Sequence, residues 1–165
     1  NMAIQAALTG HLVLSTLHTN DAPSSLTRLH DLGVQPFLTA ATILGVLAQR
    51  LVRRLCPQCK QETSMNEQEW EHLTFDYIME MPETMYKAVG CETCRHTGYK
   101  GRVGIYEFMP VSLELKSLIS AHGTLNDLKV QAKKEGVEPL RIAGARKVIE
   151  GVTTLEEVLR VVPLN

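Results

Sequence analysis

The sequence lacks any long hydrophobic run and any excess of one charge. Its 165 residues carry 17 Lys and Arg against 18 Asp and Glu, which gives a formal net charge of -1. A chain with this balance has no global field that favours nucleic acid or anionic lipid. Its apolar stretches, such as Leu12–Leu14, are short, whereas a membrane-spanning helix needs about 20 residues. The composition therefore indicates a globular protein without a membrane span and without a nucleic-acid partner.

The sequence also has no basic start followed by an apolar core and a cleavage site, so we expect no secretory signal. Asn1 is not a methionine, and residues 1–8 have the pattern of a helix without the residues that usually start one. We therefore expect a piece of a longer protein. Because 44% of the residues are hydrophobic, a chain of this length can form a substantial core.

The first third of the chain has the pattern of an α/β fold. Residues 11–20, HLVLSTLHTN, are almost unbroken in apolar character, which predicts a strand buried on both faces of a parallel sheet. Asp21 and Pro23 have the residue types of a helix start. The spacing then predicts two helices and a second strand, over 21–31, 36–47 and 51–55.

The rest of the chain changes character twice. Residues 61–85 hold seven acidic residues with no Lys or Arg, and we expect one helix there, starting near Asn66. Residues 101–108 then read as a returning strand. After Pro110 the sequence has helical periodicity, with expected helix starts at Ser112, Thr124, Pro139 and Thr154. Thr154 and Glu157 have the T-x-x-E spacing of a capping box. We place the divisions at 1–55, 56–103 and 104–165.

The acidic stretch allows two interpretations. Its flanks are basic, with Arg50, Arg53, Arg54 and Lys60 before it and Lys87, Arg95, Lys100 and Arg102 after it. It is either a solvated surface or a segment that meets its own flanks or a partner. A nucleic-acid site is disfavoured, because phosphate backbones require a basic face.

The four cysteines form two Cys-x-x-Cys pairs, Cys56 with Cys59 and Cys91 with Cys94. Two residues between thiolates allow both to ligate one ion, and two such turns complete a closed tetrahedral set. This pattern predicts a structural zinc site with no open position for catalysis. Redox dithiols, buried thiols and an iron–sulfur cluster remain alternatives. Disulfides are the weaker interpretation, since nothing in the sequence suggests export.

Two histidines flank the first predicted strand. His18 would lie at its carboxyl end, where open α/β sheets bind ligands, and could donate to a phosphate oxygen or orient water. His11 would lie at the opposite end, too far away to share a ligand. A structural hydrogen-bonding role is the alternative for His18.

These segments resemble the secretion ATPase superfamily, in the branch of type II secretion ATPases and type IV pilus assembly ATPases. The resemblance covers nearly the whole chain, and the acidic stretch is its least specific part. Residues 7–20, which contain His11 and His18 and resemble the family's histidine box, are specific to this branch when they occur together with the cysteines. Pilus-retraction relatives lack the cysteines. The matching segments are ALTGHLVLSTLHTN at 7–20, QRL at 49–51, both cysteine pairs, TGYKGRVGIYE at 97–107 and EGVTTLEEV at 150–158.

The resemblance implies the C-terminal part of a RecA-like ATPase core, a zinc-binding insert and a helical tail. It implies a hexameric motor that uses ATP and Mg²⁺ to drive pilus or pseudopilus assembly. Its implied partners are an inner-membrane platform protein and cytoplasmic components of the machine, so it would be cytoplasmic and peripheral to that membrane. His18 matches the histidine that faces the nucleotide phosphates.

One departure from the family pattern affects this interpretation. No G-x-x-x-x-G-K-[ST] motif occurs in the 165 residues, so no lysine loop cradles phosphates. The resemblance places that loop, the Walker B glutamate and the arginine fingers upstream of Asn1. We therefore predict that this chain alone hydrolyses no ATP. The alternative class is a zinc-stabilised protein-interaction module without a nucleotide role.

Overall fold

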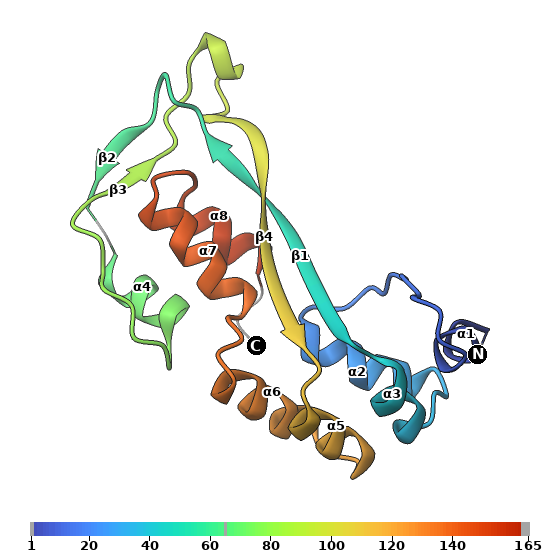
Figure 1. The fold of residues 1–165 in the computed structure, drawn as a ribbon. Coiled ribbons are helices and arrows are strands. Elements are labelled where there is room, and N and C mark those ends of the chain that lie inside the picture. Colours follow the sequence, from blue (N-terminus) through green and yellow to red (C-terminus); the bar gives the residue numbers. More distant parts are fainter. Residues whose placement is uncertain (1, 65, 163–165) are drawn as a thin grey trace. The chain divides into compact units, whose positions relative to one another are not determined.

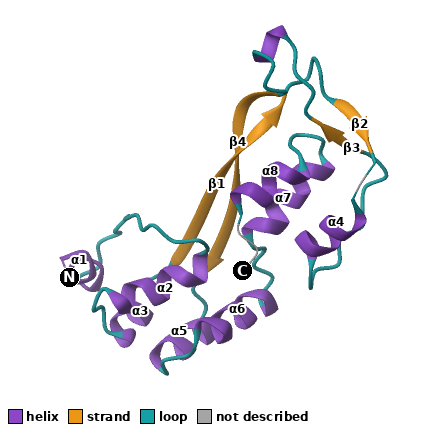
Figure 2. Cartoon of the chain, turned by 180° about the vertical axis from the view of Figure 1, so that it is seen from behind, coloured by secondary structure: helices purple, strands orange, loops and turns teal. Residues whose placement is uncertain are grey.

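A computed structural model describes residues 2–64 and 66–162 of the chain (Figures 1 and 2). Asn1, Met65 and residues 163–165 lie outside the described part. The chain forms two compact units. The first consists of Asn1–Ala48 with Glu107–Glu138, and the second of Gln49–Tyr106 with Pro139–Asn165. The predicted divisions followed chain order, whereas these units join segments far apart in sequence; those divisions remain a prediction.

The first unit is mainly helical. Its helices are α1 (Met2–Leu8), α2 (Ala22–Asp31), α3 (Pro36–Thr42), α5 (Leu113–Ser120) and α6 (Leu125–Lys134). Helix α3 packs on α1 and α5, and α6 packs on α2 and α5. The core between them is apolar and contains Leu26, Met109, Leu115, Ile119 and Leu128.

The predicted start of α2 is confirmed. The Asp21 side chain accepts a hydrogen bond from the N–H of Ser24, and proline stands in the first turn, so one free helix N–H is capped. A second carboxylate, on buried Glu107, accepts from the N–H of Ala22 at 2.9 Å. Both chain segments of this unit therefore contribute to the start of α2.

The prediction of a buried strand at residues 11–20 is wrong for this chain. Residues 11–19 have no regular secondary structure, and Leu12 and Leu14 are 77% and 88% exposed. A strand needs neighbours that satisfy its N–H and C=O groups. The two sheets in the described part of the chain use other segments, over 45–55 with 99–110 and 61–63 with 85–87. Residues 11–19 therefore pair with no strand in the described part of the chain.

Two pairs of strands replace the predicted parallel sheet. Strands β1 (Gly45–Leu55) and β4 (Tyr99–Pro110) pair with each other, as do β2 (Gln61–Thr63) and β3 (Met85–Lys87). The second pair is antiparallel, with Glu62 opposite Tyr86. The fold is therefore mixed α/β, and the return strand predicted at 101–108 is confirmed within β4.

The helix predicted over 36–47 is correct only in its first half. Helix α3 begins at Pro36 as expected but ends at Thr42, and β1 starts at Gly45. Along β1, Ala48 and Val52 are buried while Leu47 and Leu51 are exposed. Because the exposed face is also apolar, the alternation typical of a half-buried strand is hidden in the sequence.

The second unit places helices beside the short strands (Figure 1). Helix α4 (Glu67–Thr74) starts after its N-cap Asn66, as predicted, and packs on α7 (Leu140–Ile149) and α8 (Leu155–Val161). The core of the second unit includes Trp70, Leu73, Ile142, Val148 and Val158. Among the described helices, none is both long enough and apolar enough to cross a bilayer.

Candidate metal centre

The four cysteines come from two tight turns at the ends of strands. Cys56 and Cys59 follow β1, and the N–H groups of Cys59 and Lys60 bond to the carbonyl of Cys56. Cys91 and Cys94 bracket a 3-10 turn, η1 (Glu92–Cys94), that leads to β4. The N–H of Cys56 donates to the carbonyl of Gly98 at 2.9 Å, which ties the two turns together. We call residues 56–98 the cysteine lobe.

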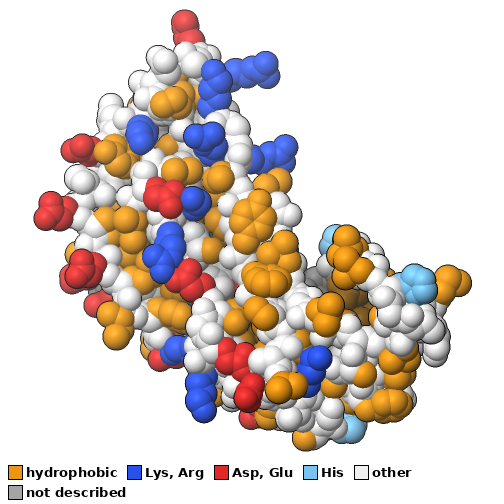
Figure 3. Space-filling view, viewed as in Figure 1, with side chains coloured by type: hydrophobic (Ala, Val, Ile, Leu, Met, Phe, Trp, Pro, Cys, Tyr) orange, Lys and Arg blue, Asp and Glu red, His pale blue; other side chains and the backbone are white. Residues whose placement is uncertain are grey.

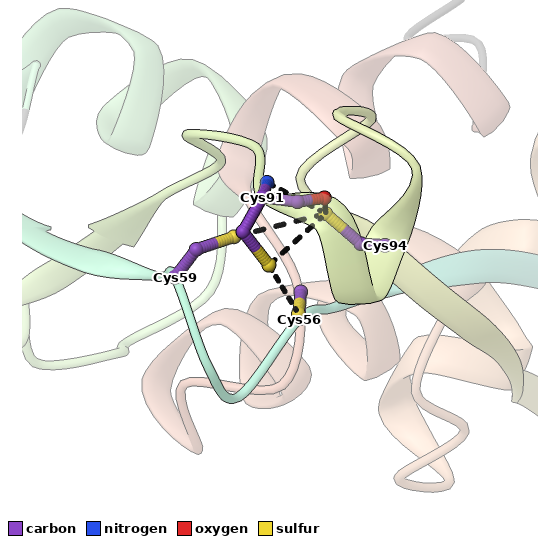
Figure 4. Close-up of side chains that lie close together, drawn as sticks. All are labelled: Cys56, Cys59, Cys91 and Cys94. Atoms are coloured by element: carbon purple, nitrogen blue, oxygen red, sulfur yellow. Dashed lines mark hydrogen bonds between the residues drawn. The ribbon is translucent and has the colours of Figure 1, made fainter.

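The four sulfur atoms converge on one point (Figure 4). All four lie within 4.8 Å of one another. The Sγ–Sγ distances are 3.9 Å for Cys56–Cys91, 3.8 Å for Cys59–Cys94 and 3.8 Å for Cys91–Cys94. Sulfurs placed tetrahedrally at about 2.3 Å from a zinc ion are about 3.8 Å apart, whereas a disulfide requires about 2.05 Å. The cluster therefore fits a tetrahedral metal ion, and its cysteines are free.

Backbone amides also point at the sulfurs. Cys94 Sγ accepts from the N–H groups of Cys91 and Gly98, both at 3.2 Å, and Cys59 Sγ accepts from Gly90 N–H at 3.3 Å. Such donors stabilise thiolate, the form that ligates metal. These hydrogen bonds are therefore compatible with four thiolates that hold a metal ion.

The thiols differ in how readily they ionise. Burial raises the pKa of Cys94, but the N–H groups of Cys91 and Gly98 and the neighbouring thiols outweigh it and lower the pKa to about 6. Burial and the other thiols raise the pKa of Cys59 to about 11, although Gly90 N–H opposes this. Without a cation Cys59 therefore retains its proton, and metal binding would release it.

Glycines make the second turn possible. Gly90 and Gly98 have φ of 115° and 77°, in the region that favours glycine. A Cβ on Gly98 would lie 2.6 Å from the Cβ of Ala88, and one on Gly90 would lie 2.7 Å from the carbonyl oxygen of His96. The close approach of the chain at these two positions sets the path of the turn that carries Cys91 and Cys94.

We expect Gly98→Ala to destabilise the protein more than Gly136→Ala. Both glycines have positive φ, but Gly136 has open space around it. Gly136→Ala therefore measures the cost of the strained backbone without a steric clash. The added clash at Gly98 should lower the free energy of unfolding by about 1–3 kcal/mol more. Urea denaturation of both variants measures this difference, and equal destabilisation would show that the lobe tolerates the extra Cβ.

The cysteine lobe is anchored to the helices of its own unit. Leu55 N–H donates to the carbonyl of Val152, and Lys60 Nζ to that of Gly151, at 2.8 and 2.9 Å. The Lys60 ammonium also lies 4.2 Å from the ring centre of Tyr86. On the other side, Tyr99 Oη and Thr154 Oγ1 are 2.8 Å apart. These contacts link both cysteine turns to the segment between α7 and α8.

The carboxylate of Glu157, expected from the sequence to be part of a capping box, lies buried in this unit. The side chain of Glu157 is fully buried and accepts from the N–H, Nε and Nη2 of Arg53 and from the Nε and Nη2 of Arg160, at 2.7–3.0 Å. Burial raises the pKa of Glu157, but these donors outweigh it and hold the pKa at about 2. Thr154 does cap α8, yet the Glu157 carboxylate bonds to arginines instead of completing the expected capping box. Arg160, three residues later on the helix, is the sequence feature that could have indicated an ion pair with Glu157.

The two histidines do not stand at opposite ends of a strand. His18 is exposed in the irregular segment 11–19, and its role as a phosphate contact stays a prediction. His11 closes the end of α1: its N–H donates to the carbonyl of Ala6, and its Nδ1 lies 3.1 Å from Thr9 Oγ1. The structure thus gives His11 a capping role.

Known proteins match this chain along almost its whole length. Residues 1–160 match the model of the Type II/IV secretion system protein family. The type IV pilus assembly ATPase TfpB of Acinetobacter baylyi is 74% identical over 165 residues, which are all of this chain and 28% of that protein. Type II secretion system protein E of Pseudomonas aeruginosa is 49% identical over 160 residues, 97% of this chain and 31% of that protein.

A relative with lower sequence identity also matches almost the whole chain. The type IV pilus assembly ATPase PilB of Thermus thermophilus is 45% identical over 158 residues, 96% of this chain and 18% of that protein. The chain belongs to the Type II/IV secretion system protein family. It spans less than a third of the length of these relatives.

Proposed function

We propose that this chain works as the C-terminal part of an ATP-hydrolysing motor for type II secretion or type IV pilus assembly. The single observation that carries the proposal is the family match over residues 1–160, in which relatives named as secretion or pilus assembly ATPases share up to 74% identity. The whole protein would be a hexamer with a RecA-like core. It would use ATP with Mg²⁺ to power assembly of a pilus or pseudopilus.

The proposed location follows from the same relationship. The motor would be cytoplasmic and held at the inner membrane by a platform protein and by cytoplasmic domains of other components.

Within that motor the cysteine cluster would hold one structural zinc ion. Cys56, Cys59, Cys91 and Cys94 supply four sulfurs with the spacing of a closed tetrahedral site, which leaves no position for water or substrate. The ion would supply binding energy that stabilises the lobe, not chemistry on the nucleotide. The carbonyls of Gly151 and Val152 receive hydrogen bonds from either side of the first cysteine turn, so the lobe would be positioned on α7 and α8.

His18 would contact the nucleotide phosphates once residues 11–20 form a strand beside the rest of the core. Two features support this proposal. Leu12, Leu14 and Leu17 are exposed in this chain, as expected for a run that needs sheet neighbours. The polar residues Thr19 and Asn20 directly follow His18, at what would be the carboxyl end of that strand.

We expect His18→Ala in the full-length protein to lower ATP turnover by about 100-fold, the scale for loss of one positioned polar group. His11→Ala is the matched control, because His11 lies in the same segment but bonds to α1. Steady-state phosphate release measures both. If the two variants retain equal turnover, the phosphate role is refuted; if the full-length protein turns over no ATP at all, the motor proposal itself fails.

A further inference from the structure

The acidic stretch carries an open groove that the motor function does not explain. It is formed by α4 and the segment 75–81, has a volume of about 450 Å³, and lies within the second unit. Trp70, Phe75, Ile78 and Met81 supply apolar surface, and Glu67 and Glu71 supply negative charge. Figure 3 shows acidic and apolar side chains interspersed on the side where α4 lies.

The apolar side chains of the groove are unusually exposed. Ile78 is fully exposed and Phe75 is 73% exposed. Large apolar groups gathered on one surface and bordered by charge mark interaction sites. Trp70 lines the same groove, is only 3% exposed, and its Nε1–H has no acceptor among the described residues. A buried donor without an acceptor is rare in folded proteins, and this one belongs to a residue that lines the groove.

The wall of the groove is fixed in place. Arg141 of α7 donates from Nη1 to the carbonyl of Leu73 and from Nη2 to that of Phe75, at 2.6 and 2.7 Å. Its guanidinium also lies 5.1 Å from the ring centre of Tyr77. The hydrogen bond to Arg141 therefore fixes the backbone of Phe75 while its side chain stays exposed. A partner would bind a surface that is already formed.

The charge of the groove specifies its occupant. Glu67 and Glu71 are exposed and four residues apart on α4, so they repel each other on one helix face. Residues 61–85 contain no Lys or Arg that could neutralise them. We propose that the groove binds a segment of a partner protein that places Lys or Arg side chains beside large apolar side chains. This inference does not depend on ATP hydrolysis.

The chain contains one tryptophan, so Trp70 fluorescence reports on the groove directly. We expect a synthetic amphipathic helix of leucine and lysine to change the emission saturably, and the same pattern built from leucine and glutamate to have no effect. Glu67→Gln with Glu71→Gln should raise the Kd about five-fold. Ile78→Ser should raise it about ten-fold and leave the fold intact, because that side chain packs on nothing.

Glu114→Gln with Glu156→Gln removes the same charge from exposed positions elsewhere and should leave the Kd unchanged. An equal Kd in all variants would overturn the proposal, as would equal binding of the glutamate peptide. Sedimentation of the unliganded chain tests the other occupant. Self-association that disappears in the groove variants would assign the groove to a second copy and would also overturn the proposal.

Discussion

Replacing Cys94 by serine is expected to reduce the bound metal from one ion per chain to almost none and to unfold the cysteine lobe. Cys94 Sγ lies 3.8 Å from the sulfurs of both Cys59 and Cys91 and accepts two backbone N–H bonds. Because the binding energy of a structural zinc is folding energy, the free energy of unfolding should fall by roughly 3 kcal/mol or more.

Metal analysis and amide hydrogen exchange measure this result. Amides of the cysteine lobe should lose protection, while those of α5 and α6 in the first unit should keep it. Gln58→Ala is the matched control, because Gln58 is exposed in the same turn and ligates nothing. A Cys94→Ser protein that retains a full equivalent of metal and unchanged lobe protection would contradict the assignment.

Glu157→Gln is expected to destabilise the protein strongly. The Glu157 carboxylate is fully buried and accepts bonds from two guanidinium groups and one backbone N–H. The glutamine amide keeps the shape but brings N–H donors against arginine donors, so we expect a loss of about 3 kcal/mol. Glu156→Gln, on the exposed neighbour, should change the stability by less than about 0.5 kcal/mol.

The same carboxylate predicts the acid sensitivity of the fold. The pKa of Glu157 is held at about 2 in the folded protein, below its usual value of 4.5. A lowered pKa contributes stability that is present above pH 4.5 and is lost as the pH falls towards 2, by roughly 3 kcal/mol in total. Urea denaturation between these pH values should show a steeper loss for the parent protein than for Glu157→Gln. Parallel curves would mean that the ion pairs add nothing to stability.

Local signals in the sequence predicted local structure well. Asp21, Asn66, Ser112 and Thr124 each cap the helix that was expected to start after them. Capping depends on side chains within three residues of the helix start, so the sequence contains the whole interaction. The cysteine cluster was predictable for a similar reason, since each pair forms its own turn.

Features that depend on distant partners were not predictable in this way. Residues 11–20 have the composition of an interior strand, but a strand forms only beside other strands, and sequence composition does not reveal whether they are present. Strand β1 was mistaken for a helix up to Leu47 because its partner, β4, lies some fifty residues later. Glu157 appeared to be a capping residue because Arg53, its main donor, lies 104 residues earlier in the sequence.

The four cysteines are proposed to hold one zinc ion in a closed site. Zinc-edge X-ray absorption of the protein, purified under reducing conditions without added metal, tests it most directly. We predict one zinc per chain with four sulfur neighbours at about 2.3 Å and no oxygen neighbour. Less than half an equivalent of metal, or a first shell that contains oxygen or nitrogen, would contradict it.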